Sequence, residues 1–180
     1  MFDQDILGLS ETAGRMLAAR SDTVACAESC TGGLLAGAIT AVAGSSAWFH
    51  GGLVAYDNAI KARSLDVRQA TLRQHGAVSE AVAREMAQGA LHAMSADWAL
   101  STTGIAGPGG AVHGKPVGTV CFGMARQLAP DVVRTLAVTR HFDGDRSEVR
   151  LASVRFALEW LLEQMQNEVA CAPGQQEAAH

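Results

Sequence analysis

The chain has 180 residues, of which 48% are hydrophobic and 18% are charged, and this composition suits one compact globular domain with a substantial core. Its formal net charge of −4 gives no general attraction to nucleic acid or to acidic membranes. The N-terminus lacks a basic signal-peptide region and no apolar run approaches the ~20 residues that span a bilayer, so we expect a cytoplasmic protein.

The first elements are predicted from hydrophobic spacing. Apolar residues at helical intervals predict an amphipathic helix over about residues 3–20, and a short apolar run predicts a strand over 23–28. Many small residues over 31–42 indicate a helix that can pack closely on a sheet and that Thr31 could cap. A second strand is predicted over 51–56.

The later elements complete an alternating pattern. In chain order they are a short helix that carries Lys61 and that Asn58 could cap, a helix over 79–95, strands over 97–102, 117–125 and 132–139, and a helix over about 146–167. The last two strands are expected to pair antiparallel. The order predicts a three-layer α/β/α sandwich around a mixed β-sheet. We assign residues 1–168 to one domain and expect a disordered tail over 169–180.

The segment AESCTGG at residues 27–33 lies at an expected strand-to-helix turn, where N–H groups converge on an anion or a developing oxyanion. Ser29 can therefore act as a nucleophile, although a helix cap is the commonest role of serine at such a place. Glu28 is either a partner or a structural hydrogen-bond acceptor. Cys30 is a rival nucleophile that an apolar environment would keep inert.

A second candidate group follows the second strand. Lys61 comes about one helical turn after Tyr56, and a lysine buried there can have a lowered pKa and act as a base toward serine. The alternatives are a solvated surface lysine and a core tyrosine with a satisfied hydroxyl.

A third candidate is the segment STTGIAGPGG at residues 101–110, whose glycines can bring bare backbone N–H groups near a ligand. It has neither a Walker lysine nor a fitting dinucleotide motif, and the alternative is a flexible connection. Arg146 could bind a phosphate, or Asp145 could simply cap the last helix and pair with Arg146. The four cysteines form no CxxC pair and no zinc spacing, so we expect reduced, mostly buried thiols.

Together these segments resemble the CinA C-terminal domain family over about residues 5–165. The resemblance rests on AESCTGG at 27–33, GSSAWF at 44–49, YDN at 56–58 with Lys61, HGAVS at 75–79, GIAGPGG at 104–110, KPVGTV at 115–120 and FDGDR at 142–146. Family members often carry an N-terminal pyrophosphatase-like domain. We expect it to be absent here, because the chain begins about one helix before the first strand.

The resemblance implies nicotinamide-nucleotide amidase activity, in which the carboxamide of nicotinamide mononucleotide is hydrolysed to nicotinate mononucleotide and ammonia. It also implies a nucleophile at Ser29, with Lys61 as the base and Tyr56 assisting. We expect backbone N–H groups near residues 30–33 to stabilise the oxyanion, by about 3–4 kcal/mol per well-placed donor. The alternative is a non-catalytic nucleotide-binding or competence-associated regulatory module.

The remaining expectations concern binding. The expected substrate-binding residues are Glu28, Cys30, Thr31, Gly32, Gly33, Asn58, Thr103, Gly104, Gly107 and Arg146. We expect a small-molecule nucleotide substrate, no cofactor, no metal, no nucleic acid and no membrane contact. The many small residues and two exposed-looking strands permit a homodimer, which is the oligomeric state we expect.

Overall fold

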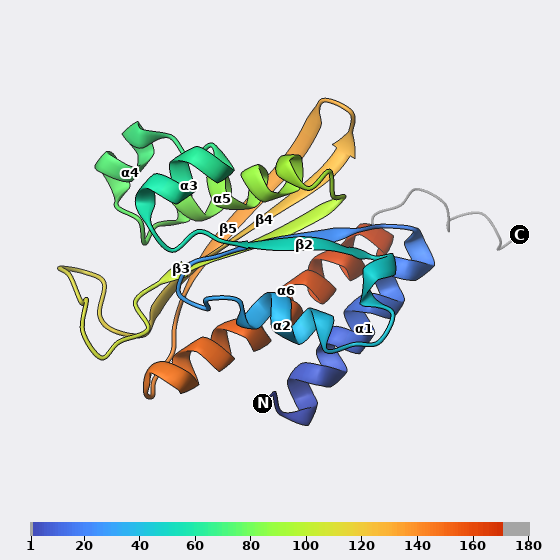
Figure 1. Cartoon of the computed structure of the whole chain (residues 1–180), viewed down its shortest axis with the longest axis horizontal. Coiled ribbons are helices and arrows are strands. Elements are labelled where there is room, and N and C mark those ends of the chain that lie inside the picture. The colour runs from blue at the N-terminus through green and yellow to red at the C-terminus, as the bar shows by residue number, and fades with distance from the viewer. Residues whose placement is uncertain (1, 171–180) are drawn as a thin grey trace, which may run out of the picture.

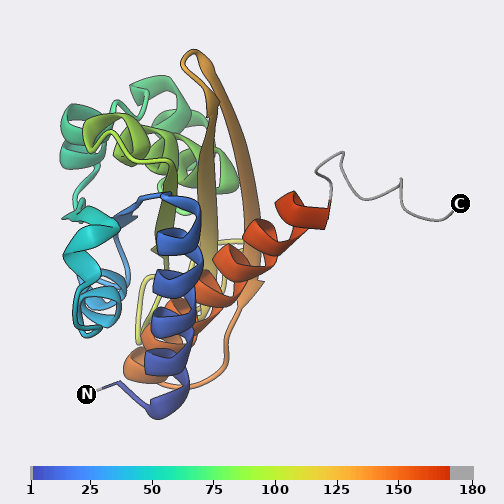
Figure 2. The same cartoon turned by 90° about the vertical axis from the view of Figure 1, so that its right-hand side faces the viewer.

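The computed structural model describes residues 2–170, and in this range a five-stranded sheet lies between two layers of helices (Figures 1 and 2). The strands are β1 (Val24–Glu28), β2 (Phe49–Val54), β3 (Trp98–Gly104), β4 (Thr119–Ala129) and β5 (Val132–His141). The helices are α1 (Gln4–Arg20), α2 (Leu34–Thr40), α3 (Asn58–Leu65), α4 (Gln69–His75), α5 (Glu80–Ala93) and α6 (Arg146–Ala170), with a 3-10 turn η1 (Ser45–Ala47). The predicted three-layer α/β/α sandwich is confirmed.

The sheet is mixed, with the strand order β2-β1-β3-β4-β5. β1 pairs in parallel with both β2 and β3, whereas β4 runs antiparallel to β3 and to β5. The predicted antiparallel pairing of the last two strands is therefore confirmed. After β1 the chain forms β2 on one side of it and then β3 on the other side. The carboxyl end of β1 is therefore the topological switch point, where open α/β sheets bind ligands.

Strand alternation builds a separate core on each face of the sheet. Val24 and Cys26 of β1 belong to the core under α1, α2 and α6, while Ala25 and Ala27 belong to the core under α3, α4 and α5. Figure 1 shows the first set of helices below the sheet and the second set above it. All five residues of β1 are buried, as expected of a central parallel strand covered on both faces.

In the core under α3, α4 and α5, two of the helices approach each other closely. A Cβ atom at Gly89 of α5 would collide with the backbone carbonyl of Leu65, so only glycine lets α3 and α5 come this near. α3 is thereby held against the carboxyl end of the parallel strands, which brings Lys61 to that edge.

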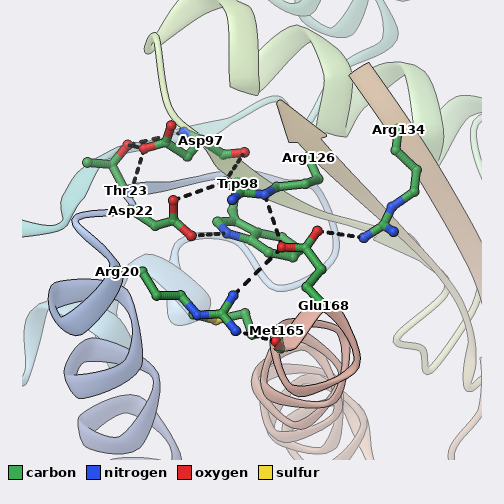
Figure 3. Close-up of polar contacts among 9 residues, drawn as sticks. All are labelled: Arg20, Asp22, Thr23, Asp97, Trp98, Arg126, Arg134, Met165 and Glu168. Atoms are coloured by element: carbon green, nitrogen blue, oxygen red, sulfur yellow. Dashed lines mark hydrogen bonds and ion pairs between the residues drawn. The ribbon is translucent and has the colours of Figure 1, made fainter. Parts of the chain in front are cut away.

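A polar network closes the opposite edge of the sheet (Figure 3). Glu168 of α6 accepts a hydrogen bond from Arg134 of β5 at 2.8 Å, and its carboxylate also lies 3.4 Å from Arg126 of β4 and 3.7 Å from Arg20 of α1. Arg126 pairs in addition with Asp22, just before β1, at 3.1 Å. The network joins the end of α6 to α1 in the same layer and to β4 and β5 of the sheet.

Several boundaries differ from the sequence prediction. α2 begins at Leu34 rather than near residue 31, because Gly33 has a φ of 94° that a helix cannot contain. Thr31 is consequently not its cap. β2 begins at Phe49, two residues before the predicted strand, and α4 was not predicted at all. β3 continues through Gly104, so the glycine-rich connection starts later than expected.

The remaining expectations concern the chain ends and the cysteines. α6 runs to Ala170, two residues into the segment predicted as a tail, and residues 171–180 lie outside the described residues. Cys26, Cys30 and Cys121 are free and buried, as expected, while Cys171 lies outside the described part. Within residues 2–170 no helix is both long and apolar enough to cross a bilayer.

Candidate active site

Ser29 is held at the end of β1 by hydrogen bonds of the turn around it. Its N–H donates to the carbonyl of Thr102 in β3 at 2.9 Å. The Glu28 carboxylate, which is fully buried, accepts from the N–H groups of Gly33 at 2.9 Å, Leu35 at 3.1 Å and Ala36 at 2.8 Å. Glu28 therefore fixes the turn and the start of α2. Of its two expected roles, the contacts are those of a structural hydrogen-bond acceptor.

Lys61 reaches Ser29 from α3. Its Nζ lies 3.0 Å from Ser29 Oγ, 2.9 Å from the Ala55 carbonyl oxygen and 3.3 Å from that of Tyr56. α3 is started by Asp57, which accepts from the Ala59 N–H at 2.7 Å, so the cap is one residue earlier than predicted.

The environment of Lys61 is dry. The side chain is 1% exposed, and burial lowers its pKa below the usual 10.5, with the charge of Asp57 and a weaker effect of Cys30 acting in the opposite direction. Lys61 is thus a buried amine next to a hydroxyl, which is the arrangement of a base beside a nucleophile.

Tyr56 and Arg146 meet across the same edge of the sheet. Arg146 donates from Nη2 to Tyr56 Oη at 2.9 Å and from Nη1 to the Gly107 carbonyl at 2.8 Å. Tyr56 follows β2 and Gly107 follows β3, and β1 lies between these two strands. The guanidinium therefore bridges the two flanks of the turn that carries Ser29. Tyr56 is 59% exposed, and it is its backbone carbonyl that accepts from Lys61, while its phenol accepts from Arg146.

Arg146 is available for this bridge because the start of α6 is capped by other groups. Asp145 accepts from the N–H groups of Ser147 at 2.7 Å and Glu148 at 3.0 Å, and Glu148 accepts in return from the Asp145 N–H at 2.7 Å. This reciprocal arrangement is a capping box. Asp145 thus caps the helix instead of pairing with Arg146.

A cavity of about 520 Å³ opens beside Arg146. Its lining consists of Ala106, Pro108, Val117, Gly144, Asp145, Arg146 and Ser147. This volume lies within the range of pockets that hold small-molecule ligands. The glycine-rich connection and the start of α6 therefore form a hollow at Arg146, the residue that also donates to Tyr56.

Several predicted binding residues are buried. Thr103 is 1% exposed and donates to the Ala77 carbonyl at 2.8 Å, and Thr31 is fully buried with its Oγ1 2.7 Å from that of Thr102. Gly104 lies in β3, where a Cβ would come 2.8 Å from the Thr119 carbonyl oxygen. These residues therefore lie beneath the surface of the site and support it.

Cys30 is unsuited to compete with Ser29 as a nucleophile. Burial raises the pKa of its thiol to about 12, so the thiol is protonated at neutral pH. Gly32 and Asn58 are exposed and Gly33 is half-buried, so these three expected residues stand at the surface of the turn and of α3.

The structure adds two residues that the sequence analysis did not identify. Thr102 holds Ser29 through its carbonyl, and Arg150 of α6 donates from Nη2 to the Thr31 carbonyl at 2.7 Å. Arg150 follows Arg146 by one helical turn, so the two arginines share a helix face. That spacing was the only signal in the sequence that could have pointed to it.

Comparison with known proteins identifies the family of this chain. Residues 7–165 match the model of the CinA C-terminal domain. The nicotinamide-nucleotide amidohydrolase PncC of Escherichia coli is 50% identical over 164 residues, which are 91% of this chain and 97% of that protein. The protein of the same name from Enterobacter agglomerans is 51% identical over 162 residues, covering 90% of this chain and 96% of that protein.

A solved structure agrees in fold. The competence/damage inducible protein CihA from Agrobacterium tumefaciens superimposes with a TM-score of 0.84 at 43% identity, over 91% of this chain and 97% of that one. On the family match and these identities, the chain belongs to the CinA C-terminal domain family.

Proposed function

We propose that this protein is a nicotinamide-nucleotide amidohydrolase that converts nicotinamide mononucleotide and water to nicotinate mononucleotide and ammonia. The observation that carries the proposal is the buried Lys61 amine 3.0 Å from Ser29 Oγ, at the edge of the sheet where ligands bind. Relatives named for this activity cover nearly the whole chain at 50% identity, which supports the same assignment.

The hydrogen-bond partners of Lys61 favour its role as a base. The carbonyl oxygens of Ala55 and Tyr56 can only accept, so they take the two N–H groups that a neutral amine possesses. The lone pair of the amine then remains for the third neighbour, the Ser29 hydroxyl. Because burial also lowers the pKa of Lys61, its neutral form is accessible in this setting.

The proposed reaction has two halves. Ser29 Oγ attacks the carboxamide carbon while its proton passes to Lys61 Nζ, and the tetrahedral intermediate collapses with cleavage of the C–N bond. The departing nitrogen takes the proton from Lys61, with Tyr56 assisting, and leaves as ammonia. Water then attacks the acyl-enzyme, Lys61 accepts a proton from that water and returns it to Ser29 Oγ, and nicotinate mononucleotide is released.

The rest of the nucleotide needs a place beside Ser29. Arg146 brings a positive charge to the edge of the 520 Å³ cavity, and we assign it to the 5′-phosphate together with the backbone around Gly107. Glu28, Cys30 and Thr31 act in this scheme as buried supports of the turn. The homodimer and the cytoplasmic location stay predictions.

Purified protein tests the proposal through ammonia release from nicotinamide mononucleotide, nicotinamide riboside and nicotinamide without added metal. We expect the mononucleotide to be preferred. Ser29→Ala should lower kcat by about 10³-fold or more, while calorimetry still detects nucleotide binding. Ser46→Ala, an exposed serine of η1, is the matched control. Full activity of Ser29→Ala would remove the covalent scheme, and wild-type binding without ammonia release would favour the non-catalytic alternative.

A further inference from the structure

Arg150 is a second arginine at the Ser29 turn, and it contacts the turn backbone from the opposite side to Lys61. Arg150 lies on α6, on the face of the sheet that α1 and α2 share, whereas Lys61 lies on α3 on the other face. Its Nη2 donates to the Thr31 carbonyl at 2.7 Å. The guanidinium also packs on Gly32, where an added Cβ would come 3.2 Å from Nη2.

Two of the five N–H groups of the turn at residues 29–33 are committed to acceptors. The N–H of Ser29 donates to Thr102, and that of Gly33 donates to Glu28. The N–H groups of Cys30 and Thr31, two buried residues, have no acceptor among the described residues. Within residues 2–170 no acceptor is found for the N–H of Gly32, which is an exposed residue.

The direction of this N–H follows from two donors to the Thr31 carbonyl, Arg150 Nη2 at 2.7 Å and the Leu34 N–H at 3.3 Å. In a planar trans peptide the C=O and the N–H lie on opposite sides, and the Thr31 carbonyl shares its peptide with the Gly32 N–H. The carbonyl is drawn toward α6 by Arg150. The Gly32 N–H therefore points away from the Arg150 guanidinium.

The contact has a cost in stability. Arg150 Nε is buried and has no acceptor among the described residues, which is also true of Arg126 Nε and Arg134 Nε in the network around Glu168. A buried donor without a partner lowers stability. An apolar side chain would fill the same space beside α2 without that loss.

We propose that Arg150 is a positioning residue for the amide hydrolysis proposed above, on which this inference rests. It fixes the Thr31–Gly32 peptide so that the Gly32 N–H donates to the substrate carbonyl oxygen as that oxygen becomes anionic. No bond forms or breaks at Arg150, and the proton transfers remain those of Ser29 and Lys61. The donor is held in place before the reaction begins, which is when orientation is most effective.

The test compares Arg150→Met and Arg150→Lys with Arg155→Gln, a control on the same helix that loses only exposed pairs with Asp3 and Asp5. We expect Arg150→Met to lower kcat for nicotinamide mononucleotide by about tenfold to a hundredfold at nearly unchanged KM, because the donor acts in the transition state. Arg150→Lys keeps one donor to Thr31 and should retain more activity than Arg150→Met.

A binding measurement separates positioning from direct contact with the substrate. In a Ser29→Ala background, adding Arg150→Met should leave the Kd for the mononucleotide unchanged, since no oxyanion forms there. A weakened Kd, or a wild-type kcat in Arg150→Met, would overturn the inference. If Arg150→Met does not fold, Arg150→Ala takes its place with the same expected loss of kcat, and a wild-type kcat in it would overturn the inference. A wild-type protein that releases no ammonia would contradict the proposed function itself.

Discussion

The contact between Lys61 Nζ and Ser29 Oγ joins residues 32 positions apart, and both are held by backbone groups rather than by other side chains. Ser29 is anchored through its own N–H to Thr102, and Lys61 is anchored by the carbonyls of Ala55 and Tyr56. These backbone anchors are uncharged, and burial acts on the pKa of Lys61 more strongly than the opposing charge of Asp57 does. The protonation state of the amine then depends chiefly on its burial.

The proposed role of Lys61 predicts the pH dependence of the reaction. Since only the neutral amine can take the Ser29 proton, kcat/KM should rise with pH and level off above the pKa of Lys61, which burial holds below 10.5. Lys61→Met should remove this rise together with nearly all activity. A profile recorded from about pH 5 to 10 checks this, and activity that is flat across that range would contradict a lysine base.

For single residues, the sequence identified candidate site residues but did not predict how far each is exposed. Ser29 and Lys61 were both identified, because a serine after a strand and a lysine after the next strand can meet at one edge of a sheet. The burial of Thr103 was not foreseen, since it depends on β3 continuing into the predicted loop. Arg150 was missed because its partner is a backbone carbonyl, which leaves no trace in the residue pattern.

Among the elements, α2 depends on a single buried carboxylate. α2 begins after two glycines with φ values of 59° and 94°, and no side chain at its first position caps it. The Glu28 carboxylate accepts from three N–H groups at this end instead. The negative charge also lies at the positive end of the helix, which favours it.

Glu28→Gln should therefore weaken both the fold and the activity. One amide oxygen replaces two carboxylate oxygens, and the amide NH₂ would face backbone N–H groups, at a cost of about 1–3 kcal/mol in the free energy of unfolding. Urea unfolding measures this, and ammonia release should fall in parallel because the turn carries Ser29. Glu11→Gln, on the exposed face of α1, is the control. Equal stability of the two variants would contradict the capping role.

α4 shows why one element could not be predicted. It is seven residues long, with no side-chain cap, so its own sequence gives it little helical preference. It is held by Glu85 of α5, which accepts from the Arg68 N–H at 2.9 Å and from Thr71 at 2.7 Å. Burial would raise the pKa of Glu85, but these hydrogen bonds outweigh it and the pKa is lowered. Tertiary contacts of this kind are invisible to periodicity.

At the scale of the whole molecule, the two ends of the parallel strands have different roles, one in the proposed chemistry and one in stability. The carboxyl edge carries Ser29 and its bridge, while the opposite edge carries the network around Glu168 shown in Figure 3. Arg20 and Arg126 are 20% and 17% exposed, so this network is more buried than an ordinary surface pair. It links α1, α6 and the β4–β5 pair far from the chemistry.

Glu168→Ala should accordingly lower stability without lowering activity. Removing the carboxylate leaves three arginines facing one another without their shared acceptor, at a cost of about 1–3 kcal/mol, between that of exposed and fully buried pairs. For a chain of this size the melting temperature should fall by about 2–4 °C for each kcal/mol. Glu163→Ala, an exposed carboxylate on the same helix, should leave the melting temperature unchanged. Because the network lies at the edge away from Ser29, kcat measured well below the transition should match that of the wild type. A kcat that fell with stability would mean that the two edges are coupled through α6, which also carries Arg146 and Arg150.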